Sequence, residues 1–408
     1  MLIAKGHQKE GATTIFCLTA LILISLTANI AIAENKLQTY NGEDPCIYIE
    51  DLTFNSTKAN ESITWQTGLG PRLPGSNASQ ILRNSITENL TGFSFEESKH
   101  QRENFTLTNL VGTYSPVNST GQNIVFVAHY DSRYMAERDD NESMIDQPID
   151  GANDGASGVA VLIELGKIIP QMNLSHDVTL FFSDAEDQGE RGYAQTWSYG
   201  ARAWVENLTE NYLTNISAYI VIDMIGDRYL DFTKIYDTSE ELWATIIPLT
   251  AALGMMENEL DCNNEFGIPI FNPNISRGVI DDHIPAHNAG IPAINFIDIN
   301  FGENASDFGG HWHTHNDTAD KVSAESLGLI GTLLELGLLT QSWSLVTVEN
   351  LVENTSSENY QNNSLESNND IENEELVPEK SKFIGYLSIT IVAVILLLIL
   401  IGDVSLKL

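Results

Sequence analysis

Short apolar runs alternate with longer, helix-like stretches along much of the chain. Four runs rich in β-branched and aromatic residues predict buried strands. They span residues 124–128, 178–182, 218–222 and 291–297. Helical patterns fill residues 79–90, 159–169 and 324–339. Because continuous apolar strands that alternate with helices indicate a parallel sheet buried on both faces, we predict an α/β fold of three layers, a mostly parallel central sheet with helices on both faces.

A histidine or an acidic residue follows each predicted strand. His129 comes directly after the first strand, Asp187 lies in the loop after the second, and Asp223 caps the third. His313 lies in the loop after the fourth strand, and Asp154 lies in a glycine-rich turn that opens a predicted helix. Because functional residues of parallel α/β sheets gather beyond the carboxyl ends of the strands, we expect these five side chains to lie together.

This set of side chains suits zinc. Two imidazoles and three carboxylates without a cysteine form a ligand set for one or two zinc ions. Asp154 could bridge two ions, which would clamp a water or hydroxide between them. Glu186, beside Asp187, is then the predicted proton shuttle. The alternative is that these acids are solvated loop residues of a very acidic protein, but their shared position at one edge of the predicted sheet argues against it.

In these motifs the chain resembles the zinc aminopeptidases of metallopeptidase family 28 and their relatives, the glutaminyl cyclases of animal and bacterial type. The resemblance covers about residues 69–339. It implies a zinc aminopeptidase-like fold, in which Asp154 bridges the metals and Glu186 is the general base. The metal ligands that it implies are His129, Asp154, Asp187, Asp223 and His313.

The resemblance leaves two reactions open. Many aminopeptidases of the family carry a Glu-Glu pair at the positions of the base and the adjacent ligand. Here these positions hold Glu186 and Asp187, and the surrounding motif, Asp-Ala-Glu-Asp-Gln-Gly, is more similar to the bacterial cyclase branch. In that branch the residues that match Asp282 and Trp312 line the substrate pocket. Against this, the glycine-rich motif is shared with true peptidases, and His129 with Asp223 would complete a second zinc site. Cyclases keep similar residues there, yet are thought to work with one zinc.

Metallo-aminopeptidase, which hydrolyses the N-terminal peptide bond, is the first prediction by a small margin, because the ligand set is complete for two metals. Glutaminyl-peptide cyclotransferase, which forms N-terminal pyroglutamate, is the alternative. Either enzyme would use zinc and would act on peptides or proteins with a free N-terminus. A catalytically inactive ectodomain that serves as a receptor is disfavoured, because such proteins are expected to lose ligands.

The ends of the chain predict a secreted and anchored protein. Residues 1–33 have the lysines, apolar stretch and small-residue cleavage site of a signal peptide. We expect the enzyme domain at 34–348 and a flexible Asn-, Ser- and Glu-rich stalk at 349–382. Residues 383–401 form an uncharged apolar run long enough for a transmembrane helix, and 402–408 would be a short cytoplasmic tail. These segments predict a catalytic domain outside the cell, anchored to the membrane by the C-terminal helix.

The formal net charge of −36 argues against nucleic acid as a partner, because phosphates would be repelled. The same charge would attract cationic peptide N-termini, although only weakly at high salt. Cys17 lies in the predicted signal peptide, which leaves Cys46 and Cys262 to form one disulfide or to remain two buried thiols. Many Asn-x-Ser/Thr sequons predict a glycoprotein, but the sequon at Asn316 follows His313 closely and is expected to be unmodified.

Overall fold

The computed structural model describes residues 42–102 and 105–344. The predicted signal peptide, stalk, membrane helix and cytoplasmic tail lie outside these residues. Within the described ranges, no helix combines the length and the apolar character that crossing a membrane requires.

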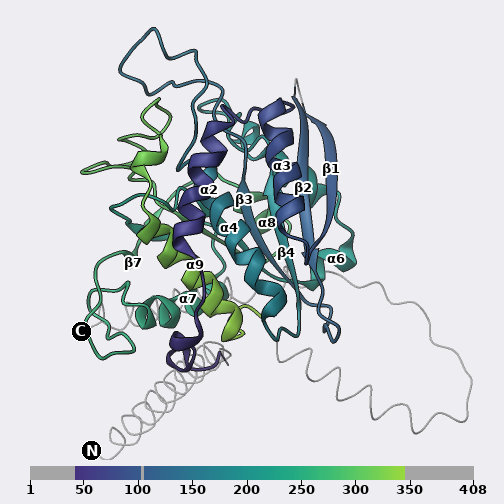
Figure 1. The fold of residues 1–408 in the computed structure, drawn as a ribbon, viewed down its shortest axis with the longest axis vertical. Helices are drawn as coiled ribbons and strands as arrows, with labels where there is room; N and C mark the ends of the chain where they lie inside the picture. Colours follow the sequence, from purple (N-terminus) through teal and green to yellow (C-terminus); the bar gives the residue numbers. More distant parts are fainter. Residues whose placement is uncertain (1–41, 103–104, 345–408) are drawn as a thin grey trace, which may run out of the picture. The chain divides into compact units, whose positions relative to one another are not determined.

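A six-stranded sheet lies at the centre of the described part (Figure 1). Its strands lie in the order β1-β2-β4-β3-β5-β8. The strands β3, β4, β5 and β8 run parallel to one another, and β1 and β2 add an antiparallel edge. Their bounds are β1 Ser94–Arg102, β2 Phe105–Tyr114, β3 Asn123–His129, β4 Asp177–Ser183, β5 Ile216–Asp223 and β8 Ala293–Ile297. A separate parallel pair is formed by β6 Phe232–Ile235 and β7 Phe271–Arg277.

Helices cover both faces of the sheet. In Figure 1, α2, α4 and α9 pack side by side on the near face. Helices of the larger core are α2 Ser56–Gly68, α3 Asn77–Asn89, α4 Ala156–Ile168, α7 Glu240–Ala252 and α9 Ala324–Leu339. Helices of the smaller core are α5 Tyr199–Glu206, α6 Glu210–Asn215 and α8 His283–Asn288. Short 3₁₀ helices span Pro45–Ile47, Ile49–Asp51, Ile169–Gln171, Ala194–Thr196 and Ala319–Lys321.

The central strand β3 shows why cover on both faces is needed. Ile124 and Phe126 belong to the larger core, whereas Val125 and Val127 belong to the smaller one. Successive side chains of a strand point to opposite faces, so a strand that is apolar at every position must be buried on both sides. The predicted fold, an α/β protein with a mostly parallel central sheet between helices, is confirmed.

Among the N-terminal elements, α3 lies where a helix is predicted, whereas α2, β1 and β2 were not anticipated. Helix α2 begins after Asn55, whose side chain accepts a hydrogen bond from the N–H of Lys58. It buries only Ala59, Ile63 and Gln66, so its sequence carries a weak apolar pattern. The antiparallel strands β1 and β2 were also missed, and β1 has mainly polar and charged residues because it is an edge strand.

A disulfide joins Cys46 to Cys262, with 5.3 Å between the Cα atoms and a sequence separation of 216. The alternative of two free thiols is thereby excluded. The bond ties the segment before α2 to the segment between α7 and β7. Two distant parts of the chain are therefore held together covalently.

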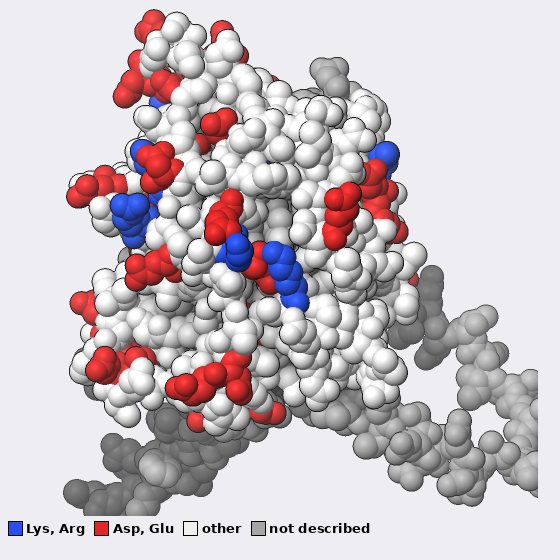
Figure 2. Space-filling view, in the orientation of Figure 1, with Lys and Arg blue, Asp and Glu red and all other residues white. Residues whose placement is uncertain are grey.

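Acidic side chains are scattered across the face of the protein drawn in Figure 2, and basic groups there are few. The whole sequence has 56 acidic residues against 20 lysines and arginines, which accounts for this surface. The described residues of this face form no broad basic patch.

Candidate active site

The carboxyl ends of adjacent parallel strands bring the site together. β3 lies between β4 and β5, so the chain leaves β3 toward one side and later returns to the other. His129 is the last residue of β3 and Asp223 the last of β5, whereas β4 ends at Ser183, shortly before Glu186. A reversal of this kind opens a crevice at the carboxyl edge of the sheet, where ligands bind.

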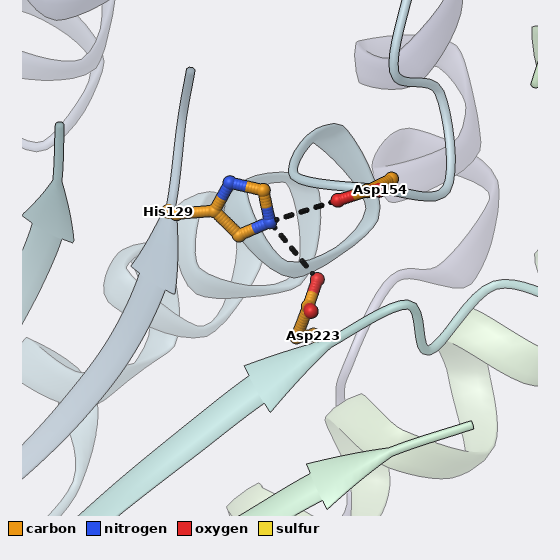
Figure 3. A group of neighbouring side chains, drawn as sticks. All are labelled: His129, Asp154 and Asp223. Carbon is orange, nitrogen blue, oxygen red and sulfur yellow. Dashed lines mark hydrogen bonds and ion pairs between the residues drawn. The ribbon is translucent and has the colours of Figure 1, made fainter. Parts of the chain in front are cut away.

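His129, Asp154 and Asp223 form a first donor group (Figure 3). His129 Nε2 lies 3.0 Å from Asp223 Oδ1 and 3.2 Å from Asp154 Oδ1. Figure 3 shows the imidazole directed from the end of β3 toward both carboxylates. The turn that presents Asp154 continues through Gly155, which has a φ of 92° and would bring a Cβ within 2.7 Å of the Asp131 carbonyl oxygen. Only glycine fits this turn.

Asp187 and His313 form a second donor group, again with Asp154. His313 Nε2 lies 3.0 Å from Asp187 Oδ1 and 3.5 Å from Asp154 Oδ2. Asp154 therefore presents Oδ1 to one histidine and Oδ2 to the other, as a bridging carboxylate would. All five residues predicted as ligands come together, each at most 6% exposed.

The chemistry of the two groups fits a metal ion. Asp154 Oδ2 and Asp187 Oδ2 are buried without a hydrogen-bond partner among the described residues. Burial raises the pKa of Asp187 and of Asp223 to about 6. Burial opposes protonation of His313, yet the carboxylate of Asp187 raises the pKa of this imidazole to about 9. Carboxylates this close together are costly to bury unless a cation compensates them, so a bound cation would stabilise the arrangement.

Further carboxylates lie behind the two histidines. Glu137 Oε1 lies 2.8 Å from His313 Nδ1, and Asp131 Oδ1 lies 3.5 Å from His129 Nδ1. A carboxylate at Nδ1 favours the tautomer that leaves Nε2 free to bind a metal. These two acids therefore orient the imidazoles toward the donor groups.

Two of the supporting acids also fix the loops that carry the donors. Asp131 accepts hydrogen bonds from the backbone N–H groups of Glu186 and Asp187, each at 3.1 Å. Asp317 accepts a hydrogen bond from the backbone N–H of Asp154 at 3.1 Å. The positions of the base and of the bridging aspartate thus depend on carboxylates outside the donor groups.

The sequence patterns did not single out these three supporting residues, Asp131, Glu137 and Asp317. In a chain with 56 acidic residues, an aspartate or glutamate in a loop carries little information by itself. The one available signal was proximity, since Asp131 lies two residues after His129 and Asp317 lies four after His313.

Glu186 belongs to a third group of buried acids, with Asp281 and Asp282. Ser198 Oγ donates to Glu186 Oε1 at 3.1 Å, and Asn295 Nδ2 donates to Asp281 Oδ2 at 2.7 Å. Burial, reinforced by Asp281, raises the pKa of Glu186 well above its usual value. Burial also raises the pKa of Asp281 to about 7 and that of Asp282 to about 8. Such shifts suit proton transfer near neutral pH.

A cavity of about 150 Å³ opens beside the donor groups. Trp312, predicted to line the substrate pocket, is part of its wall and stacks on His313 with 3.6 Å between ring centroids. Asp281 also lies in the wall, whereas Asp282 is fully buried and accepts a hydrogen bond from Ser183 Oγ. The remaining wall residues are Asp154, Glu186, Asp187, Trp197, Asp223, Met224, Val279, Ile280, Ile297 and Phe308. The cavity is mostly apolar, although five acids contribute to its wall, and it suits a single side chain.

The backbone at the site adopts an uncommon conformation at several non-glycine residues, three of which are, or directly adjoin, predicted site residues. Ala185, directly before Glu186, has a φ of 59°. Met224, directly after Asp223, has a φ of 47°, and His313 itself has a φ of 52°. Left-handed backbone at a residue with a Cβ costs about 1–2 kcal/mol, and such strain collects at functional sites.

A mostly parallel α/β sheet with imidazole and carboxylate donors at its carboxyl edge defines this protein as an α/β enzyme of the metal-dependent class. Residues 109–336, more than half of the chain, match Peptidase family M28. The chain therefore belongs to peptidase family M28, which confirms the family resemblance of the motifs. Membership of this family, together with the donor groups, implies a bound metal.

Similar proteins include both cyclases and peptidases. The glutaminyl-peptide cyclotransferase of Bothrops jararaca is 23% identical over 382 residues, which cover 83% of this chain and 98% of that protein. The crystal structure of Porphyromonas gingivalis glutaminyl cyclase has a TM-score of 0.61 at 26% identity, over 71% of this chain and 99% of that one. A Zn-dependent exopeptidase from Parabacteroides distasonis shares the fold, with a TM-score of 0.59 at 24% identity over 70% and 98% of the two chains. The protein is accordingly an enzyme of the M28 peptidase or glutaminyl cyclotransferase type.

Proposed function

We propose that this protein is a zinc-dependent glutaminyl-peptide cyclotransferase. The observation that carries the proposal is the setting of Glu186, a carboxyl only 6% exposed in a small, mostly apolar cavity beside two further acids. Cyclisation moves a proton within the substrate and needs no water, so a nearly dry base is an advantage. The relative from Bothrops jararaca, matched over almost its whole length, carries the same name and supports the choice.

In this reaction the α-amine of an N-terminal glutamine attacks the γ-carbonyl carbon of its own side chain. A zinc ion held by Asp154, Asp187 and His313 would polarise that carbonyl. Glu186 accepts a proton from the attacking amine and donates a proton to the departing amide nitrogen, which leaves as ammonia. The bond between the α-nitrogen and the γ-carbonyl carbon closes the pyroglutamate ring. Trp312 and the apolar wall exclude water that would otherwise compete with the amine.

An aminopeptidase remains the second candidate, on the strength of one observation. Asp154 directs its two oxygens to two separate histidines, each with its own terminal carboxylate. Paired metal sites with a shared carboxylate are typical of hydrolases, in which both metals act on one water. In that reaction Glu186 would take a proton from the water and pass it to the leaving amine.

Two peptides separate the candidates. The full-length protein is incubated separately with one peptide that begins with Gln and one that begins with Leu. The masses of the products are measured by mass spectrometry. Loss of ammonia from an otherwise intact Gln peptide supports the cyclotransferase. Release of free leucine, without loss of ammonia from the Gln peptide, shows the aminopeptidase instead. N-acetylated versions of both peptides should be inert, because both reactions need the free α-amine.

We also propose that the enzyme acts outside the cell, anchored to the membrane by residues 383–401. The signal-like residues 1–33 and the apolar run at 383–401 support this location, as does the disulfide, which suits an oxidising compartment. Protease added to intact cells should remove the catalytic domain and release its activity into the medium. Protection until the cells are lysed would contradict the proposal.

A further inference from the structure

A positive charge that the proposed chemistry does not use lies against the part of the cavity wall that Trp312 forms, called the rim below. The guanidinium of Arg138 lies 5.1 Å from the centre of the Trp312 ring, and Trp312 is part of the cavity wall. Arg138 itself is exposed to solvent. A substrate whose first residue fills the cavity must lead its next residues out over the rim. An exposed guanidinium against this wall residue is within reach of the second or third residue of a peptide that leaves the cavity past Trp312.

The position of Arg138 is fixed by the backbone on either side of it. The backbone N–H of Arg138 donates to the carbonyl oxygen of His313 at 3.1 Å. The carboxylate of the next residue, Asp139, accepts a hydrogen bond from the backbone N–H of His315 at 3.0 Å. Contact between a guanidinium and an indole ring adds a cation–π attraction. The charge is therefore held beside the rim by the same loop that carries a predicted metal ligand.

Arg138 has no acidic partner among the residues that the structure describes. Its neighbour Arg133 shows the contrast, because it is buried, pairs with Glu137 at 2.8 Å and donates to the backbone carbonyl of Asp187. In a chain with 56 acidic residues, an arginine at the active site without an acidic partner is notable. Its planar set of donors is free to bind an incoming carboxylate in a bidentate fashion.

We propose that Arg138 binds a carboxylate of the substrate just beyond the N-terminal residue, so that the enzyme prefers acidic peptides. The proposal rests on the proposed function, since it assumes that the first residue of a peptide occupies the cavity. The carboxylate can belong to an aspartate or glutamate side chain at the second or third position. It can equally be the C-terminal carboxylate of a very short peptide, which presents the same chemical group.

Two matched pairs of substrates test the preference and distinguish its sources. Gln-Glu-Ala-amide against Gln-Gln-Ala-amide isolates the side-chain carboxylate, and Gln-Ala against Gln-Ala-amide isolates the terminal one. For at least one pair, we expect kcat/KM of the charged member to be about three- to tenfold higher, mainly through a lower KM. The preference should shrink at about 1 M NaCl, where charges are screened within ~3 Å. Equal kcat/KM values in both pairs at low salt would overturn the proposal.

Variants then assign the preference to this residue. Arg138→Gln should abolish it, and Arg138→Lys should retain part of it because the charge is kept but the planar fork is lost. The control Lys58→Gln, which removes an exposed charge from helix α2, should show the wild-type preference. A preference that survives Arg138→Gln contradicts the proposal.

Failure of the proposed function would look different from failure of the Arg138 proposal. If no Gln peptide loses ammonia, the cyclotransferase assignment is wrong, and the same pairs are measured with Leu in the first position by release of leucine. A preference for acidic Leu peptides that depends on Arg138 would still support the rim site. If neither the Gln peptides nor the Leu peptides show a preference for acidic substrates, the rim site is overturned as well.

Discussion

Glu186 and Asp187 are adjacent in sequence, yet their side chains meet different partners. Glu186 lies with Asp281 and Asp282 and accepts a hydrogen bond from Ser198, whereas Asp187 lies 3.0 Å from the imidazole of His313. The two side chains point to different partners because the backbone is left-handed at Ala185, directly before the pair. Two hydrogen bonds from the backbone of the pair to Asp131 then hold this arrangement. One residue is thus placed to move a proton and the other to bind a metal.

Substitution of the two neighbours should therefore fail in different ways. Glu186→Gln keeps the shape but removes the proton carrier, and should lower kcat by about 10²–10⁴-fold while the metal content stays that of the wild type. Asp187→Asn should lower the metal content, because it weakens a donor of the second group. Rates and metal content, the latter by plasma mass spectrometry, are measured on the same preparations. Near-normal turnover of Glu186→Gln would refute the proton-shuttle role.

His283 should make the stability of the fold depend on pH. Burial lowers its pKa to about 4, and its ring nitrogens lie 3.3 Å from Asn295 Nδ2 and from the backbone oxygen of Tyr236. The unfolded chain, with a histidine pKa of about 6.5, binds the proton first as the pH falls. The free energy of unfolding should therefore decrease from about pH 6.5 to about pH 4, by up to about 3 kcal/mol from this residue.

Urea unfolding of wild type and His283→Gln at a series of pH values measures this contribution. The advantage of the wild type over the variant should shrink as the pH falls through that window. His287→Gln, on the same helix but exposed, is the matched control and should parallel the wild type. A constant difference between wild type and His283→Gln across the window would contradict the prediction.

The site residues that could be predicted from sequence are those whose place relative to an apolar run is recognisable. His129 and Asp223 each end a run of apolar residues, and their place at the sheet edge follows from that alone. Glu137 gives no such signal. It lies in a polar loop and contacts His313, from which it is separated by 176 positions in sequence, only in the folded protein. Contacts of this kind depend on tertiary packing, which local patterns do not contain.

At the scale of elements, apolar periodicity located what lies in the core. Helix α9 has the predicted bounds, and the four predicted strands form the parallel part of the sheet. Strand β7 was missed because it is only partly buried and contains Pro273, which is unfavourable inside a sheet. Elements that pack at the edge of a fold carry mixed patterns, and their identity is decided by neighbours distant in sequence.

The disulfide should contribute strongly to the stability of the folded domain. It closes a long loop between Cys46 and Cys262, which restricts the unfolded chain more than the folded one. The double variant Cys46→Ala, Cys262→Ala should lose about 2–5 kcal/mol of unfolding free energy in urea. Wild type treated with dithiothreitol should match the variant, and the variant itself should not respond to the reductant. Equal stability of oxidised wild type and variant would contradict this expectation.

At the scale of the whole molecule, the excess of negative charge opposes the compact state. Like charges repel more strongly in the folded protein than in the expanded chain, and dissolved ions screen that repulsion. The urea midpoint should therefore rise as NaCl increases from about 0.01 M to about 0.5 M, over which the Debye length falls several-fold. KCl should give the same curve if screening is the cause. A midpoint that depends on the identity of the cation would point to specific ion binding instead.

The left-handed backbone at Ala185 has a consequence for how this enzyme could be engineered. Glycine adopts that conformation without strain, but it gains more freedom in the unfolded chain and loses a buried methyl group, so Ala185→Gly should leave the melting temperature about unchanged. The same substitution makes the backbone directly before Glu186 more flexible, so the Glu186 side chain is positioned less precisely and kcat should fall several-fold. A laboratory selection for heat resistance alone would thus tolerate Ala185→Gly, whereas one for turnover would reject it. A lower melting temperature with unchanged kcat would show that Ala185 contributes to packing and not to the position of Glu186.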